Sequence, residues 1–146
     1  MKAYSRFTRP ADTTAYTAND AVANNTTAGS VTPLSFGMAF NHGAITQVRV
    51  RKTDQSVSTP TIRVWLYAAS PTPGAGDNAA FAHPIAESLN FVDVSVVNAG
   101  SDDAAGWTPC YRPYSAGTVY ALLQAITAFT PASEEVFQVD IWYEQT

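Results

Sequence analysis

This chain has little charge, a single cysteine and no long apolar run. Charged residues make up 14% of its 146 residues, against roughly 25% in a typical soluble domain. The single cysteine, Cys110, excludes an intramolecular disulfide and leaves no CxxC or Cys/His metal pattern. No run approaches the ~18 consecutive apolar residues of a membrane-spanning helix, and the first residues lack the apolar core of a signal peptide. We therefore expect no membrane partner, and a protein that stays in a cytosol or is assembled there into a particle.

Basic residues are also few. The net charge is −4, and the eight Lys and Arg form no long run, whereas nucleic-acid binders use a basic stripe to neutralise phosphates. We therefore expect no nucleic-acid partner. Arg49, Arg51 and Lys52 lie close together in the sequence, and so short a cluster is typical of a solvated strand face. A polar surface with few charges also favours a protein that lies against other subunits.

The pattern that is present is a two-residue alternation of apolar and polar side chains, which is typical of half-buried strands. It occurs in residues 46–51, 61–68, 91–97 and 135–144. Residues 118–126 also fit helical spacing, but their β-branched and aromatic start favours a central strand that is apolar on both faces. Residues 107–114 contain prolines and predict at most an edge strand.

The whole chain predicts an all-β protein built as an antiparallel β-sandwich. Several strands separated by turn signals, with almost no helix, lead to this architecture. Residues 1–33 are rich in Thr, Ala and Asn and show little periodicity. We expect them to form an extended N-terminal arm that packs on the domain or on a neighbouring molecule. Residues 34–146 are predicted to form the sandwich domain, which is long enough to bury a core.

Turn-forming residues mark the connections. Residues 54–60 predict a hairpin loop and residues 98–106 a second loop. Residues 70–90 hold the longest connection, where Pro and Gly are too dense for regular structure apart from a short helical turn around residues 84–88. A loop of this length in a compact domain is typically functional or makes contacts. The glycines are predicted to lie at turns that need positive φ.

Catalytic and metal-binding motifs are missing from the sequence. His42 and His83 lie in turn-like settings without a GxSxG elbow, and no phosphate-binding glycine loop occurs. The acidic pairs at 102–103 and 134–135 consist of adjacent residues, whose side chains point apart in an extended chain. The spaced pattern of a calcium-binding loop is absent as well. We therefore predict no enzyme activity, no cofactor and no metal site.

Five segments of the sequence resemble those of a known protein family. They are TAYTANDAV at residues 14–22, GAITQVRV at 43–50, IRVWLY at 62–67, SPTP at 70–73 and DNAAF at 77–81. Their order, over about residues 12–97, resembles that of the decoration, or cement, proteins of tailed-bacteriophage heads, which are small jelly-roll-like virion proteins. The resemblance implies a structural protein on the outer capsid surface, assembled in the host cytoplasm. It further implies the major capsid protein as partner and a homo-oligomer, with a trimer favoured, that stabilises contacts between capsid subunits.

Six aromatic residues are the candidate partner contacts, because Trp and Tyr dominate binding hot spots. They are Tyr4, Phe7, Tyr16, Trp65, Tyr67 and Trp107. Trp65 and Tyr67 alternate with the inward residues of their strand, so their face needs cover from a loop, the arm or a partner. Packing within the domain is the alternative for each of the six.

Two other functions stay open at this point. A carbohydrate- or receptor-binding module of a phage tail or baseplate would stack sugar rings on exposed aromatics, with Trp65, Tyr67, Trp107 and Tyr111 as candidates. A hydrolase would use His83 with loop acids such as Asp77, although no motif supports that chemistry.

Overall fold

The computed structural model describes residues 1–53, 59–98 and 103–146, and strands dominate these residues. The strands are β1 (Lys2–Thr8), β2 (Ala21–Val22), β3 (Leu34–Gly37), β4 (Gly43–Lys52), β5 (Thr61–Tyr67), β6 (Ser88–Ser95), β7 (Val97–Asn98), β8 (Ala104–Tyr114), β9 (Thr118–Ala125) and β10 (Val136–Glu144). Two single 3-10 turns, η1 (Ala28–Ser30) and η2 (Ile85–Glu87), are the helical parts of the described chain. The second of them lies where the short helical turn was predicted.

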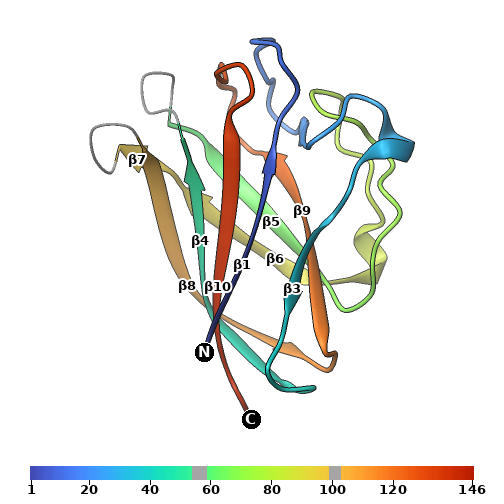
Figure 1. The fold of residues 1–146 in the computed structure, drawn as a ribbon, viewed down its shortest axis with the longest axis vertical. Coiled ribbons are helices and arrows are strands. Elements are labelled where there is room, and N and C mark those ends of the chain that lie inside the picture. The colour runs from blue at the N-terminus through green and yellow to red at the C-terminus, as the bar shows by residue number, and fades with distance from the viewer. Residues whose placement is uncertain (54–58, 99–102) are drawn as a thin grey trace.

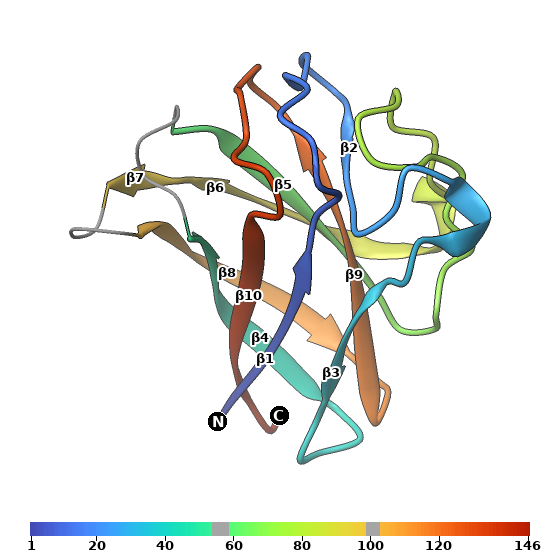
Figure 2. The ribbon, with the colours of Figure 1, turned by 45° about the horizontal axis from the view of Figure 1, so that its top comes forward.

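The strands form two antiparallel sheets that lie as two layers (Figures 1 and 2). The first sheet has the order β1-β10-β4-β8-β7, and the second has the order β2-β9-β5-β6, with β3 also paired to β9. From β4 onward the chain repeatedly crosses between the layers: β5 and β6 lie in the second sheet, β8 in the first, β9 in the second and β10 in the first. The prediction of an all-β antiparallel sandwich is confirmed.

Alternate residues of the long strands fill the space between the sheets. In β5, Ile62, Val64 and Leu66 point inward and are fully buried, as the alternation predicted. Burying such a side chain contributes about 1.5–3 kcal/mol. Strand β9 is buried on both faces: Leu123 belongs to the core between the sheets, whereas Leu122 belongs to a second cluster on the outer side. The double burial explains why residues 118–126 lack a simple alternation.

Residues 1–33 are mostly extended, and they pack on the sheets of their own chain. Strand β1 pairs with β10 along its whole length, and β2 pairs with β9. Tyr16 forms a bridge with Phe129, and their rings stack with centroids 4.7 Å apart. In this structure, the segment that was predicted as an arm therefore pairs with strands of its own chain.

A buried polar cluster fastens this N-terminal segment to the rest of the fold. The guanidinium of Arg9 donates through Nη2 to Asp77 at 3.0 Å and through Nε to the hydroxyl of Tyr16 at 3.0 Å. That hydroxyl donates to the second oxygen of Asp77 at 2.5 Å, and the backbone N–H of Ala23 donates to the same oxygen at 2.8 Å. Arg9 also donates to the carbonyl of Ala132, 123 residues away in sequence, at 3.2 Å. We call these five residues the Arg9 cluster.

The charges of the Arg9 cluster are compensated inside the protein. Burial by itself lowers the pKa of Arg9, but the hydrogen bonds and charges of Tyr16, Asp12 and Asp77 outweigh it and hold that pKa above its ordinary value. Burial raises the pKa of the Asp77 carboxyl, and the hydrogen bonds from Ala23 and Tyr16 oppose that shift. Because each buried group has partners, the cluster ties its segments together, whereas the loss of one partner would leave a buried charge.

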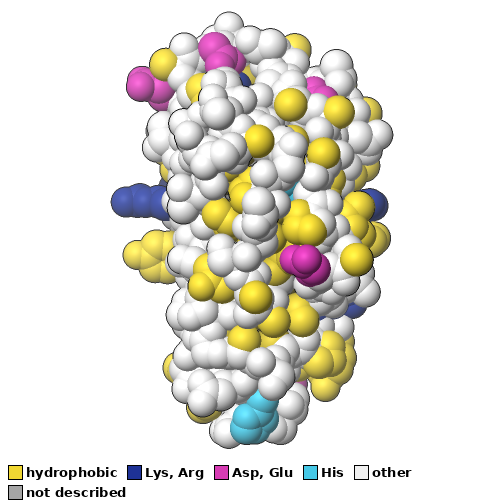
Figure 3. Space-filling model, turned by 90° about the vertical axis from the view of Figure 1, so that its right-hand side faces the viewer, with side chains coloured by type: hydrophobic (Ala, Val, Ile, Leu, Met, Phe, Trp, Pro, Cys, Tyr) yellow, Lys and Arg dark blue, Asp and Glu magenta, His cyan; other side chains and the backbone are white. Residues whose placement is uncertain are grey.

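The long connection of residues 70–84 lies against the second sheet and the N-terminal segment. The backbone N–H of Ala21 donates to the carbonyl of Ala79, and that of Phe81 donates to the carbonyl of Asn19. Gly76 approaches so closely that a Cβ atom there would collide with the carbonyl of Thr26. Figure 3 views the side that carries this connection, where charged side chains are few among hydrophobic and neutral ones.

Three further sequence predictions have different outcomes in the structure. No described glycine has a positive φ, so the glycine prediction was wrong, and close backbone approach explains Gly76 better. Strand β8 pairs with β7 at only two residues beyond its partner β4, so most of it is an edge strand, as predicted for residues 107–114. The predicted loops at 54–60 and 98–106 lie partly outside the described residues.

Candidate functional site

The outer face of the first sheet gathers aromatic and basic side chains in three cross-strand rows. Each row takes one residue from β1, β10, β4 and β8 in that order. The rows are Lys2–Trp142–Gln47–Pro109, Tyr4–Asp140–Arg49–Trp107 and Arg6–Gln138–Arg51–Ala105. We call these twelve residues the aromatic–basic face. In Figure 1 it corresponds to the layer of β1, β10, β4 and β8.

A buried carboxylate lies at the centre of the aromatic–basic face. Asp140 is fully buried, although it points away from the core between the sheets. It accepts hydrogen bonds from Nε of Arg49 at 2.8 Å and from Nε2 of Gln138 at 3.2 Å, and Nη2 of Arg49 and Nζ of Lys2 lie 2.7 and 3.2 Å from its oxygens. Both Arg49 contacts reach the same oxygen, Oδ2, and together these charge-assisted contacts orient the guanidinium.

A hollow of about 250 Å³ opens beside Asp140, between two indole rings. Its walls are Trp107 and Trp142, and its lining is completed by Gln47 and Arg49. Lys2 and Arg49 lie 5.3 and 5.6 Å from the ring centroid of Trp142, within the range of cation–π attraction. Trp107 has no such partner among the described residues and is 61% exposed. The hollow thus combines one indole restrained by cations, one free indole, the guanidinium of Arg49 held by Asp140, and the amide of Gln47.

The aromatic–basic face differs from the whole chain in the sign of its charge. It holds four of the eight Lys and Arg residues, namely Lys2, Arg6, Arg49 and Arg51. Its one acidic member is Asp140, and Asp103, which lies next to the face, pairs with Arg51 at 2.5 Å. Among the described residues, the face counted together with Asp103 therefore carries a surplus of two positive charges on a chain whose net charge is −4.

Exposed apolar side chains also concentrate on this side. Of the six large apolar side chains that are exposed in the described chain, Tyr4, Trp107 and Tyr111 lie on β1 and β8 of the first sheet. Tyr4 and Trp107 are members of the aromatic–basic face, and Tyr111 follows Trp107 on β8. Exposed Tyr and Trp beside Arg are the composition of binding hot spots.

The outer face of the second sheet is covered by the protein itself. The ring of Trp65 stacks on Phe81 from the 70–84 connection and contacts Phe91, with centroid separations of 5.8 and 5.0 Å. Its indole N–H donates to Gln124 at 2.9 Å. Tyr67 is buried in the same cluster, and burial, with a smaller contribution from the charge of Glu87, raises its pKa to about 12.

The structure divides the six predicted contact residues into three groups. Tyr4 and Trp107 are exposed on one face and stay candidates. Phe7 is half-buried and stacks on Phe137 with centroids 5.8 Å apart. The predictions for Tyr16, Trp65 and Tyr67 need correction, because these side chains are buried inside the chain and cannot meet a partner in this state.

Several residues of the aromatic–basic face were missed as contacts from the sequence. Trp142, Asp140 and Gln138 alternate with the inward residues of β10, and Arg49 alternates with those of β4, so the alternation already placed them outside the core. What the sequence lacked was the pairing of β10 with β4, which brings the two sets together. The interpretation of Lys52 as solvated was wrong, because its Nζ is buried 2.8 Å from an oxygen of Glu135.

The residues considered for hydrolysis are occupied by structural contacts. Nδ1 of His83 accepts the backbone N–H of Gly74 at 3.0 Å, and burial lowers the pKa of His83 to about 4. Asp77 belongs to the Arg9 cluster. Within residues 1–53, 59–98 and 103–146, no group of three or more His, Cys, Asp or Glu side chains could hold a metal ion. None of the described helical segments has the length and apolar character to cross a membrane.

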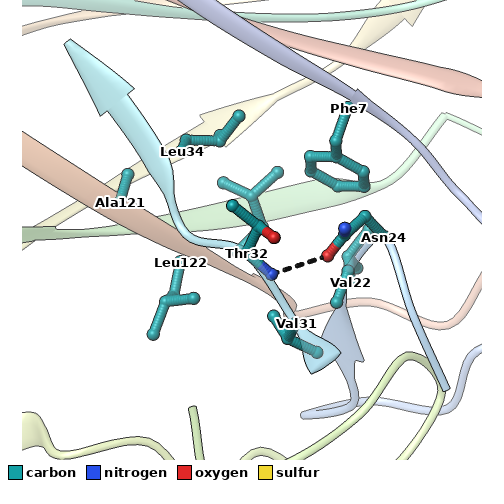
Figure 4. Close-up of a pocket in the computed structure, with 10 residues that line it drawn as sticks. Phe7, Val22, Asn24, Val31, Thr32, Leu34, Ala121 and Leu122 are labelled. Atoms are coloured by element: carbon teal, nitrogen blue, oxygen red, sulfur yellow. Dashed lines mark hydrogen bonds between the residues drawn. The ribbon is translucent and has the colours of Figure 1, made fainter. Parts of the chain in front are cut away.

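Two further hollows lie beside β1 and β3 and share several lining residues, and Figure 4 shows the inner one, which is small. Phe7, Val31 and Leu34 surround an inner void of about 10 Å³, which offers room for one water at most. The backbone N–H of Thr32 donates to Oδ1 of Asn24 at 2.9 Å beside it. The other hollow, about 410 Å³, is open and mostly polar. It lacks the convergent aromatic and charged groups of the aromatic–basic face.

Comparison with known proteins adds no family to this description. No protein-family model matches the chain, and no curated protein sequence matches it either. The inference of function therefore depends on the geometry of the aromatic–basic face and on the resemblance carried by residues 12–97.

Proposed function

We propose that this protein is a non-catalytic virion protein that binds the outer surface of a tailed-phage head and stabilises contacts between capsid subunits. The observation that supports it most is the aromatic–basic face, where exposed Trp107 and Tyr4 surround the fixed pair Arg49–Asp140. Trp, Tyr and Arg are the residues that contribute most to protein–protein hot spots. The major capsid protein is the proposed partner, and the outer capsid surface is the proposed location.

The order of the strands supports a jelly roll, the architecture expected from the resemblance. If the two-residue strands β2 and β7 are set aside, eight strands remain, and we number them 1 to 8 along the chain. Strand 1 then pairs with 8, 2 with 7, 3 with 6 and 4 with 5. The sheets have the orders 1-8-3-6 and 2-7-4-5. Jelly rolls of eight strands occur in viral capsid and lectin domains.

A trimer is the oligomer we propose, placed at three-fold or quasi-three-fold positions of the head. Closed symmetry is the usual state of homo-oligomers, and three copies would present three aromatic–basic faces to the shell together. Multivalent attachment would strengthen binding without a larger contact per copy.

Two measurements test this proposal. Light scattering of the purified protein should give the mass of a trimer, and the protein should co-sediment saturably with heads stripped of it. Trp107→Ala should weaken head binding by about 30-fold or more, as loss of a hot-spot residue of about 2 kcal/mol does. The matched control is Ile85→Ala, which removes an exposed apolar side chain outside the face and should bind normally. A monomer that ignores heads would contradict the proposal.

The alternative function is a carbohydrate- or receptor-binding module of a phage tail or baseplate. The hollow between Trp107 and Trp142 favours it, because an exposed indole above Gln47 and Arg49 offers a stacking surface beside hydrogen-bonding groups. A glycan array and a pull-down on cell-wall material would identify such a module. Saturable sugar binding lost in Trp107→Ala, without head binding, would favour this function over the first.

A further inference from the structure

We infer that the partner segment bound by the aromatic–basic face is an acidic stretch of protein that also carries one apolar side chain. Its carboxylates would pair with Lys2, Arg6 and Arg49, and its apolar side chain would enter the hollow beside Trp107. This inference rests on the proposed function, because it names the chemistry of the partner surface at the same face.

The first argument is the distribution of charge. Counted together with Asp103, the face has a surplus of two positive charges among its described residues, on a chain whose net charge is −4. An acidic partner would be repelled by most of the molecule and attracted at this face. Such complementarity orients the encounter and raises the association rate more than it raises affinity.

The second argument is the number of cations that lack a carboxylate of their own. Arg49 and Lys2 share the single carboxylate of Asp140. Arg49 uses Nε and Nη2 for it, which leaves Nη1 available. Arg6 forms no ion pair in the described part of the chain. Docking removes water from such cations, and a buried cation without a partner is costly, so a stable complex requires acids from the other side.

The third argument is that the hollow offers a single free stacking surface, which suits a protein segment with one apolar side chain better than a long acidic polysaccharide. Lys2 and Arg49 already lie near the ring of Trp142, so Trp107 is the indole of the hollow that is free to stack. A polysaccharide gains from successive stacking platforms, whereas a single hollow of about 250 Å³ fits one apolar side chain. Carboxylates on both sides of that side chain would meet the flanking cations.

The experiment measures binding of the full-length protein to the peptide Glu-Glu-Phe-Glu-Glu by calorimetry at low and high NaCl. The controls are the Gln and Lys versions of this peptide and sodium polygalacturonate. We expect binding of the Glu peptide alone, with at least a fivefold loss of affinity at high salt. The double variant K2Q/R6Q should lose at least fivefold at low salt. The charge-matched variant R63Q/R112Q, which removes two cations outside the face, should stay within twofold.

Three outcomes would overturn the inference. These are equal binding of the Glu and Lys peptides, equal affinities of the two double variants, and tighter binding of polygalacturonate than of the Glu peptide. The proposed function is tested separately by co-sedimentation with stripped heads. Head binding that neither salt nor K2Q/R6Q alters would leave the proposed function standing and overturn the acidic partner. Glu-peptide binding without head binding would support the acidic partner and overturn the phage-head function.

Discussion

The outer faces of the two sheets carry aromatic residues in similar patterns, yet only one of these faces is open. On the second sheet, Trp65 and Tyr67 alternate with core residues and are then covered by Phe81 and its connection. On the first sheet, Tyr4 and Trp107 alternate in the same way and stay exposed. An outward position in a strand therefore does not determine whether a side chain meets water. The connections between the strands decide it.

Polar contacts hold the cover of the second sheet in place, whereas several cations of the open face have no carboxylate of their own among the described residues. The Arg9 cluster joins the 70–84 connection to the N-terminal segment through Asp77, and its buried groups are paired within the chain. At the open face, Asp140 orients Arg49 but leaves cations available for a partner. The same types of interaction thus stabilise the fold in one region and prepare a surface in the other.

The largest difference in stability between the two faces is expected when an aromatic side chain is removed from each. Trp65→Ala should lower the free energy of unfolding by about 3–5 kcal/mol, because it leaves a cavity beneath the cover. Trp107→Ala should lower it by less than about 0.5 kcal/mol, as surface substitutions do. Urea unfolding followed by circular dichroism measures both. Equal losses would show that the two faces do not differ as described.

Removing Asp77, which anchors the cover through the Arg9 cluster, should lower the free energy of unfolding by nearly as much. Asp77→Ala leaves the buried guanidinium of Arg9 without its one fully buried carboxylate, so that only the partly exposed Asp12 still pairs with it, and breaking a buried pair costs about 3–5 kcal/mol. Asp93→Ala breaks the partly exposed Arg63–Asp93 pair and should cost no more than about 1 kcal/mol. Thermal unfolding of the two variants makes the comparison. If Asp93→Ala proves as harmful as Asp77→Ala, the Arg9 cluster is not the anchor.

Lowering the pH should reduce the free energy of unfolding through His83, which lies in the cover of the second sheet. Burial holds its pKa near 4 in the folded protein, below the ordinary 6.5, so the unfolded chain binds more protons between these values. The contribution of neutral His83 to the free energy of unfolding is therefore complete above pH 6.5, falls as the pH drops toward 4, and is about 3 kcal/mol in total. His83→Asn keeps an acceptor for the Gly74 N–H but cannot take up this proton. Urea unfolding from pH 7 to 4 should show a smaller pH dependence in His83→Asn, and identical profiles would exclude His83 as the cause.

The smallest effect is a difference in tryptophan fluorescence quenching between the two faces. Acrylamide should quench the fluorescence of Trp107 several-fold more than that of Trp65, because the first is 61% and the second 6% exposed. Because the chain has a third tryptophan, Trp142, the comparison is made in a Trp142→Phe background, where Trp107→Phe and Trp65→Phe each remove one of the two remaining signals. Stripped heads should protect Trp107 from acrylamide and leave Trp65 unaffected. Protection of neither residue would argue against docking through this face.

Much of the fold could be predicted from the sequence, because strand alternation is a local property. The inward positions of β5 and the double burial of β9 follow from side chains two residues apart, and both are found in the structure. The candidate site was predicted less well. Tyr4 and Trp107 are on it, but Trp142, Arg49 and Asp140 come together only through the pairing of β10 with β4. Pairing joins residues some 90 positions apart in sequence, and no local pattern specifies it.

The sequence by itself determined the class of fold, the absence of an intramolecular disulfide and the low charge, because composition and two-residue periodicity act along the chain. Only the tertiary structure decided which outward aromatics stay open and which cations share a carboxylate. Burial of a side chain depends on what packs above it, and the charge of a surface depends on which strands lie side by side. For this protein, Phe81 and the Arg9 cluster close one face, and the order β1-β10-β4-β8 assembles the other.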